Sequence, residues 1–176
     1  MRRATAAAGS AVFFVVAPAF LAGLVPWWLT GWTVGQPLGG WAWAPLRVVG
    51  GFLLLAGAAA LLHCFGRFVV EGNGTPAPVA PPERLVVGGL YRYVRNPIYL
   101  ALVATIVGQA LLLGQLGLLL YAGLVAALVA AFVYAYEEPT LLSQFGAEYE
   151  AYRRAVPAWW PRWRPWEPDR HRDSRP

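Results

Sequence analysis

The stretch NPIYLALVATIVGQALLLGQLGLLLYAGLVAALVAAFVYAY, residues 96–136, contains no charged side chain and decides the fold. It is about twice as long as the roughly 20 residues that carry a helix across the hydrocarbon core of a bilayer, so it cannot be one straight span. The break Gly114-Gln115 near its middle favours a tight turn. We therefore expect two antiparallel transmembrane helices, at about 97–113 and 116–136, that form a hairpin.

Two further apolar stretches precede the hairpin, at about 10–29 and 45–70. Hydrophobic residues make up 58% of the 176 residues and charged ones 13%, against about 25% charged in an ordinary soluble domain. A chain of this length has too little interior to hide so much apolar surface from water. The composition predicts an all-α integral membrane helical bundle of four transmembrane helices, forming a single domain over 1–166. A polar tail, 167–176, follows it.

The arginines predict the orientation of the bundle. All fourteen basic residues are arginine, and only Arg47 lies outside the N-terminus, the connection between the second and third spans, and the region after the fourth. The positive-inside rule then places both termini and residues 67–95 in the cytoplasm of a multi-pass cell-membrane protein. Since the arginines flank apolar spans, we expect the lipid bilayer, and no nucleic acid, to be their partner. The first span follows Met1-Arg2-Arg3 as in a signal peptide, but it is too long and ends in Trp27-Trp28, so we expect it to be retained.

A fifth helix is expected at about 140–156, because apolar side chains recur there at helical spacing opposite a polar face. This pattern is typical of an amphipathic helix at the membrane interface. The apolar positions are Leu141, Leu142, Phe145, Tyr149, Tyr152 and Val156. Four tryptophans then alternate with arginines and indicate an interfacial anchor. They are Trp159, Trp160, Trp163 and Trp166.

Two cytoplasmic features allow a structural and a functional interpretation. The Gly- and Pro-rich segment 71–82 is either a linker or a rigid loop that covers a ligand at the membrane surface. His63 and Cys64, near the end of the second span, are either packing residues or members of a site. As the only cysteine, Cys64 excludes an intrachain disulfide and a multi-cysteine metal site, and we expect no metal.

The start of the third span is the first candidate site. Asn96 is expected to cap the helix and Pro97 to occupy its first position, which needs no function beyond starting a helix. The same geometry directs unpaired backbone N–H groups at the interface, beside Arg95 and one turn from Tyr99. Together these groups suit a bound carboxylate.

Glu137 and Glu138 form the second candidate site, where the fourth span is expected to end. A carboxylate pair at the membrane boundary and at a helix C-terminus is unfavourable, so it either marks the helix exit or binds a ligand cation or hydroxyl groups. Because the hairpin returns the chain to the same face, we expect the pair to oppose Asn96. The two walls together suit a zwitterionic ligand that carries a sugar diol.

These motifs, in this order, resemble the isoprenylcysteine carboxyl methyltransferase family and the related phospholipid methyltransferases. The resemblance covers roughly residues 67–161, and its strength lies in the joint spacing of the motifs. They are Gly89-Leu90-Tyr91, Arg95-Asn96-Pro97-Ile98-Tyr99, Glu137-Glu138, Leu142, Phe145-Gly146, Tyr149, Tyr152 and Val156-Pro157.

The resemblance implies a membrane methyltransferase that uses S-adenosyl-L-methionine without a Rossmann domain, and the chain has no Gly-rich dinucleotide loop. It implies an adenosine side, a methionine side and an opposite wall, to which we add Arg95 and Glu138 as supporting residues. It assigns no catalytic residue. The implied cofactor-binding residues are Glu83, Arg84, Leu85, Val86 and Tyr91 for adenosine, Asn96, Pro97, Ile98 and Tyr99 for methionine, and Glu137 for the opposite wall.

Two positions depart from the family pattern. Asn96 stands where the family usually has histidine, and an amide cannot carry a proton in catalysis. Val133-Tyr134-Ala135 stand where an arginine often serves the substrate. We therefore expect a lipophilic acceptor that is already nucleophilic, as in isoprenylcysteine carboxyl O-methylation. The alternatives are a phospholipid N-methyltransferase and a non-catalytic membrane scaffold that retains the fold.

Overall fold

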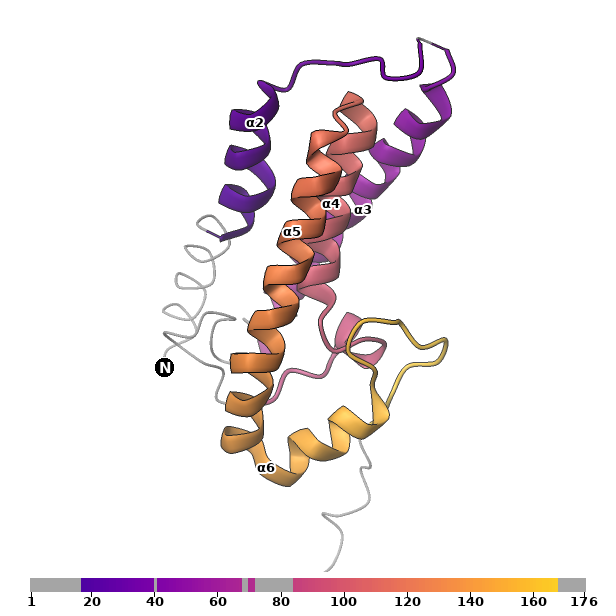
Figure 1. Ribbon diagram of the computed structural model, residues 1–176. Coiled ribbons are helices and arrows are strands. Elements are labelled where there is room, and N and C mark those ends of the chain that lie inside the picture. The colour runs from indigo at the N-terminus through magenta and orange to yellow at the C-terminus, as the bar shows by residue number, and fades with distance from the viewer. Residues whose placement is uncertain (1–16, 40, 68–69, 72–83, 168–176) are drawn as a thin grey trace, which may run out of the picture.

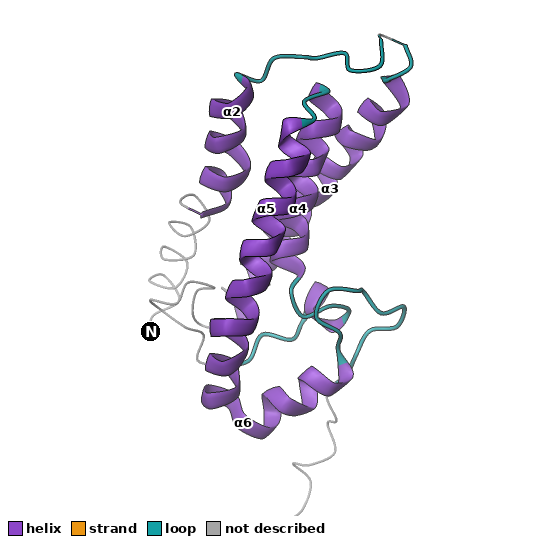
Figure 2. Ribbon diagram, viewed as in Figure 1, coloured by secondary structure: helices purple, strands orange, loops and turns teal. Residues whose placement is uncertain are grey.

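The computed structural model describes residues 17–39, 41–67, 70–71 and 84–167, and the regular structure within these ranges is entirely helical. The elements are η1 (Phe20–Leu24), α2 (Val25–Thr30), α3 (Ala44–Arg67), η3 (Gly89–Arg92), α4 (Pro97–Leu113), α5 (Gly117–Phe132), η4 (Val133–Glu137) and α6 (Glu138–Ala155). Helices α3, α4 and α5 run together as the body of the molecule, and α2 stands beside one end of it (Figure 1). Loops connect the helices at both ends of this body (Figure 2). The expected all-helical class is confirmed for the described part of the chain.

Two helical stretches are long and apolar enough to cross a membrane, by length and composition. They are α3 and the continuous stretch Gly117–Ala155, whereas Ala17–Thr30 and Pro97–Leu113 are apolar but shorter. The expected ranges 45–70, 97–113 and 116–136 start within one residue of α3, α4 and α5, and the range 97–113 also ends where α4 ends. The first expected span starts at residue 10, outside the described residues, so the count of four spans stays a prediction.

The turn between α4 and α5 lies where the Gly114-Gln115 break predicts it. Gly114 ends α4 in the left-handed conformation, with φ +67°, and its N–H donates to the Ala110 carbonyl. The N–H of Gln115 donates to the same carbonyl, at 2.9 Å. Because a glycine has no Cβ to strain this conformation, the chain reverses within a few residues and α5 packs back along α4.

Glycines bring α3 and α4 into backbone contact. A Cβ on Gly108 would lie 2.5 Å from the Leu54 nitrogen, and one on Gly57 would lie 2.5 Å from Thr105 Oγ1. Small residues of this kind allow close packing between helices where apolar burial alone gives no driving force. Beside this contact, the apolar core of α3, α4 and α5 comprises Leu61, Phe65, Ala101, Leu102, Ile106, Ala122 and Val125.

A π-helical turn in the N-terminal helix explains how that helix is held to the bundle. Pro26 has no N–H for the Ala22 carbonyl, and Val25 donates to Phe20 instead of Leu21. The Ala22 carbonyl accepts a hydrogen bond from Gln109 Nε2 at 2.5 Å. The Leu21 carbonyl accepts one from the Tyr121 hydroxyl at 2.8 Å. The two polar side chains thus bind backbone acceptors that the proline turn leaves unused.

The helix that contains Glu137 and Glu138 does not end there, which corrects the expectation of a helix C-terminus at this pair. The backbone passes from α5 through the π-helical η4 into α6, and Pro139 occupies the second position of α6. The expected amphipathic helix at 140–156 exists as Glu138–Ala155, but Gly146 interrupts it with φ +52°. Beyond Gly146 the helix turns across the end of the bundle (Figure 1).

Residues 156–167, here called the C-terminal strap, pack against residues 92–95. The Pro157 carbonyl of the strap accepts a hydrogen bond from the Arg95 N–H, at 2.9 Å. In the other direction, the Arg162 N–H donates to the Tyr93 carbonyl at 3.0 Å, and the Trp166 N–H donates to the Arg92 carbonyl at 2.9 Å. The four tryptophans expected to form one anchor differ in their surroundings. Trp160 and Trp163 are 83% and 100% exposed. The other two are Trp159, which bonds to Tyr134, and Trp166, which packs on Tyr152.

Candidate functional site

The first turn of α4 and the η4–α6 junction meet at one end of the bundle, here called the α6 end. The Tyr99 hydroxyl donates to Glu137 Oε2 at 2.8 Å. Arg95 Nη1 lies 2.6 Å from Glu138 Oε1. The two motifs that the sequence predicts to oppose one another are therefore in direct contact.

Arg95 is enclosed by acceptors. Besides its bond to Glu138, Nη1 donates to the Tyr149 hydroxyl at 3.1 Å. The side chains of Arg95 and Glu138 are only 12% and 13% exposed, and Arg153 adds a second cation 3.7 Å from Glu138 Oε2. Arg95 Nε is buried and has no hydrogen-bond partner among the described residues. Arg95, which we expect to help bind a carboxylate, is thus partly engaged by the chain's own Glu138, and its Nε has no partner among the described residues.

Asn96 does not cap α4, contrary to the expectation from sequence. Its side chain makes no capping bond. Its Nδ2 donates instead to the Ala158 carbonyl of the strap, at 3.1 Å. Pro97 has no N–H, so the donors of the first turn are the backbone N–H groups of Ile98 and Tyr99, and the Asn96 side chain accepts a hydrogen bond from neither. The α4 N-terminus remains an uncapped, electropositive helix end beside Arg95.

Tyr91 lies behind this contact, in η3. It is buried with Cys64 and Val86, and its carbonyl accepts a 2.7 Å bond from the Tyr152 hydroxyl. Burial raises the pKa of Tyr91 well above its ordinary value, and the nearby Cys64 and Glu137 raise it further. The phenol therefore stays neutral at physiological pH.

The remaining expected positions divide between this site and its surroundings. Val86 is buried beside Tyr91, whereas Leu85 packs with Tyr149 and Tyr152 on the other side. Arg84 is exposed, Ile98 packs against the apolar core, and Glu83 lies outside the described residues. The structure thus brings together Tyr91, Arg95, Tyr99, Glu137 and Glu138, and does not bring Leu85 or Arg84 to the same contact.

A second polar cluster lies at the end of α3, and the sequence patterns did not predict it. Arg67 forms an ion pair with Glu71, and Glu71 Oε2 accepts a 3.0 Å bond from the Gly88 N–H.

Gly89 has φ +59°, and a Cβ on it would collide with His63 Nε2. His63 is exposed, whereas Cys64 is fully buried. The Gly88-Gly89 pair was the available signal, because adjacent glycines often allow a close backbone approach. Of the Gly- and Pro-rich segment, residues 72–82 lie outside the described residues.

The fold and the site together define a class: a helical membrane protein with a charged site at one end of its apolar bundle. Residues 42–148 match the model of the phospholipid methyltransferase family, and the chain belongs to that family. The matched range contains α3, the hairpin and both glutamates, and it excludes the strap. No curated protein and no solved structure matches the chain. The resemblance inferred from the motifs is confirmed, and membership of this methyltransferase family, with two helices able to cross a membrane, supports an enzyme of that class in a membrane.

Proposed function

We propose that the chain transfers a methyl group from S-adenosyl-L-methionine to a lipophilic acceptor, with the cofactor held at the α6 end. The observation that supports this most is the pairing of an uncapped α4 N-terminus and Arg95 with Glu137 and Glu138. The cofactor carries a carboxylate, an ammonium group, a sulfonium and a ribose diol. Cationic and anionic groups on opposite walls match this charge pattern.

The polar atoms of the site fit such a ligand. The buried Nε of Arg95 lacks a partner among the described residues, and with the Ile98 and Tyr99 N–H groups it offers donors for a carboxylate. Glu137 Oε2 is engaged by Tyr99, while its Oε1 accepts no bond from the described residues and is available to ribose hydroxyls. Tyr91 and Val86, which are buried together, form the adenosine side in this proposal.

The bound cofactor supplies an electrophilic methyl group, so the protein has to align the acceptor and exclude water. Asn96 holds the strap through Ala158 and cannot carry a proton. This supports an acceptor that needs no base, and carboxyl O-methylation of the isoprenylcysteine type is the activity we place first.

Phospholipid N-methylation is the second candidate, and the family match favours it. A protonated amine must lose its proton before it attacks a methyl group. Glu137 is the carboxylate placed to accept it. The two candidates share the cofactor site and differ in the acceptor and in whether a proton acceptor is needed.

One experiment tests the shared part. Purified protein in nanodiscs should show a rise in melting temperature with S-adenosyl-L-methionine and with its demethylated product, and Glu137→Gln should remove most of that rise. Glu148→Gln, at an exposed position of α6, is the matched control and should keep it. The absence of any shift in the unaltered protein would favour a non-catalytic scaffold.

A second experiment separates the acceptors. Labelled cofactor is incubated with the protein and total membrane lipids, and the products are separated by lipid class. Label in methylated amine headgroups indicates N-methylation, whereas base-labile label in a methyl ester indicates O-methylation.

Both candidate activities require the α6 end to face the cytoplasm, as the predicted four-span arrangement places it. The arginines at this end support that orientation.

A further inference from the structure

A groove runs between α4 and α5 next to the Tyr99–Glu137 contact. Its volume is about 260 Å³, and it is lined by Tyr99, Leu100 and Val103 of α4, Ala126, Val129 and Ala130 of α5, and Trp159 of the strap. None of these side chains carries a charge. The phenol of Tyr99 and the indole of Trp159 supply its polar atoms.

The position of the groove indicates what fills it. It opens between the apolar helices α4 and α5, and the outer face of α5 is exposed at Leu120, Leu124 and Leu128, where a membrane protein meets the bilayer. An uncharged groove in these surroundings matches hydrocarbon and rejects a charged headgroup. Its volume lies below the roughly 300–1,000 Å³ of sites that enclose whole small molecules. One segment of a single alkyl chain is therefore the occupant that fits.

Small residues give this groove its shape. Ala126 and Ala130 lie one turn apart on α5 and face Leu100 and Val103 of α4. Because lipid tails are as apolar as these walls, moving a chain from the bilayer into the groove gains little from the hydrophobic effect. The groove acts through shape, by orienting a chain rather than by extracting it from lipid.

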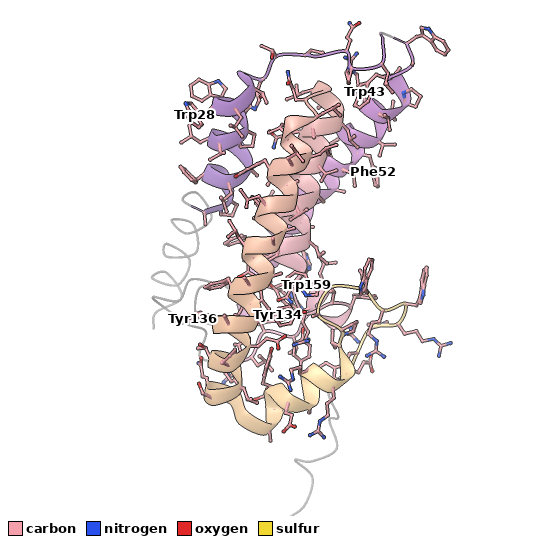
Figure 3. The ribbon with its side chains drawn as sticks, viewed as in Figure 1. Trp28, Trp43, Phe52, Tyr134, Tyr136 and Trp159 are labelled. Carbon is pink, nitrogen blue, oxygen red and sulfur yellow. The ribbon has the colours of Figure 1, made fainter. Side chains whose placement is uncertain are left out.

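Trp159 is fixed at the α6 end of the groove. Its Nε1 donates to the Tyr134 hydroxyl at 2.7 Å, and the two rings meet edge to face with centroids 6.3 Å apart. The preceding residues of the strap are bonded to Arg95 and Asn96 at the start of α4. Figure 3 shows the two labelled rings side by side at the lower part of α5. The strap, α4 and η4 thus jointly hold the indole over the groove.

We propose that this groove binds one alkyl chain of the methyl acceptor, and that Trp159, held by Tyr134, closes its α6 end and sets how far the acceptor reaches toward Glu137. This rests on the proposed methyl transfer at the α6 end. An acyl chain and an isoprenoid chain share the chemistry that the groove recognises. Tyr134 and Trp159 are both neutral, so an uncharged pair closes the mouth of the groove.

Photocrosslinking tests the groove independently of activity. The protein is placed in phosphatidylcholine nanodiscs that contain either phosphatidylethanolamine with a diazirine on its acyl chain or a farnesylcysteine with a diazirine on its isoprenoid chain. After illumination, mass spectrometry of the digested protein should find adducts at residues 99–103 and 126–130. The probe that labels more strongly identifies the chain source.

Substitutions that fill the groove give the decisive comparison. Ala126→Leu and Ala130→Leu should lose most of these adducts, whereas Ala127→Leu, at the adjacent exposed position, should keep them. A melting curve of each variant checks that it is folded, and two filling variants guard against one that is not. Equal labelling in all variants, or equal labelling at Leu120 and Leu128, would show ordinary bilayer contact and overturn the proposal.

The role of Trp159 has its own test. Tyr134→Phe and Trp159→Phe both remove the same hydrogen bond and keep an aromatic ring, so both should raise the KM for the acceptor several-fold without changing the cofactor-induced shift in melting temperature. An unchanged KM in both variants would refute the role of Trp159. Failure of the cofactor to stabilise the unaltered protein would refute the proposed function instead, and the crosslinking result would still report on the groove.

Discussion

Arg95 and Glu138 lie 2.6 Å apart and join the start of α4 to the start of α6, although 43 positions of the chain separate them. Both side chains are nearly buried. Removing one partner of a buried pair leaves the other charge uncompensated. This contact therefore fixes the distance between the two walls of the site.

Glu138→Gln should lower the free energy of unfolding by about 3–5 kcal/mol, the cost typical of breaking a buried ion pair. Arg153→Gln removes the other cation near Glu138, but Arg153 is 43% exposed and 3.7 Å away, so its loss should cost less than about 1 kcal/mol. Reversible unfolding in detergent micelles measures both. Equal losses would mean that Arg95 and Glu138 do not form the dominant contact.

Tyr99→Phe should weaken binding of the demethylated cofactor product about tenfold, because it deprives Glu137 of the hydroxyl that orients its carboxylate. Isothermal titration in nanodiscs gives the dissociation constants. Tyr121→Phe removes a comparable hydroxyl that bonds to Leu21, far from the site, and should leave the dissociation constant unchanged. Equal weakening in both variants would argue against a local role of Tyr99.

Gly108→Ala should destabilise the bundle by about 1–3 kcal/mol, because the new Cβ would overlap the backbone of α3 at Leu54. Gly123→Ala introduces the same methyl group on α5, where nothing lies within 4 Å, and should cost nothing. Melting temperatures in one detergent measure the difference. A similar loss in both variants would indicate a general effect on these helices and not the contact between α3 and α4.

The proposed orientation predicts opposite labelling of two exposed positions. In a Cys64→Ser background, Trp41→Cys in intact cells should react with a membrane-impermeant maleimide, whereas Arg84→Cys should react only after the cells are opened. Trp41 and Arg84 are both exposed in the structure, so accessibility within the protein does not decide the result. The reverse pattern would contradict the positive-inside assignment.

Much of the fold follows from local sequence. The Gly114 turn, both ends of α4 and the start of α5 are predictable because a glycine break in a long apolar run has few alternatives. The meeting of Tyr99 with Glu137 follows from that hairpin. The family-like spacing also locates Arg95 and Glu138 correctly at one end.

Other features depend on contacts that no local pattern reveals. Asn96 bonds to Ala158 instead of capping α4, because the strap folds back over the start of that helix. Glu137 does not end a helix, since η4 changes the hydrogen-bond register ahead of Pro139 and helical backbone continues. The hydrogen bonds of Gln109 and Tyr121 could have been anticipated, because both are polar residues in apolar helices. Pro26 and the π-helical turn before it leave the Ala22 and Leu21 carbonyls free to accept these bonds.

The helices α5, η4 and α6 form one continuous helical stretch, which contains both a groove residue and a residue of the charged site. Ala130 of the groove and Glu137 lie on the same helix, about 10 Å apart at 1.5 Å per residue. The irregular Gly146 lies beyond both. A change of tilt imposed by a thinner or thicker bilayer therefore moves them together. An acceptor seated in the groove must carry its reactive group within this distance of its chain, which favours molecules with a short spacer over those with a large headgroup.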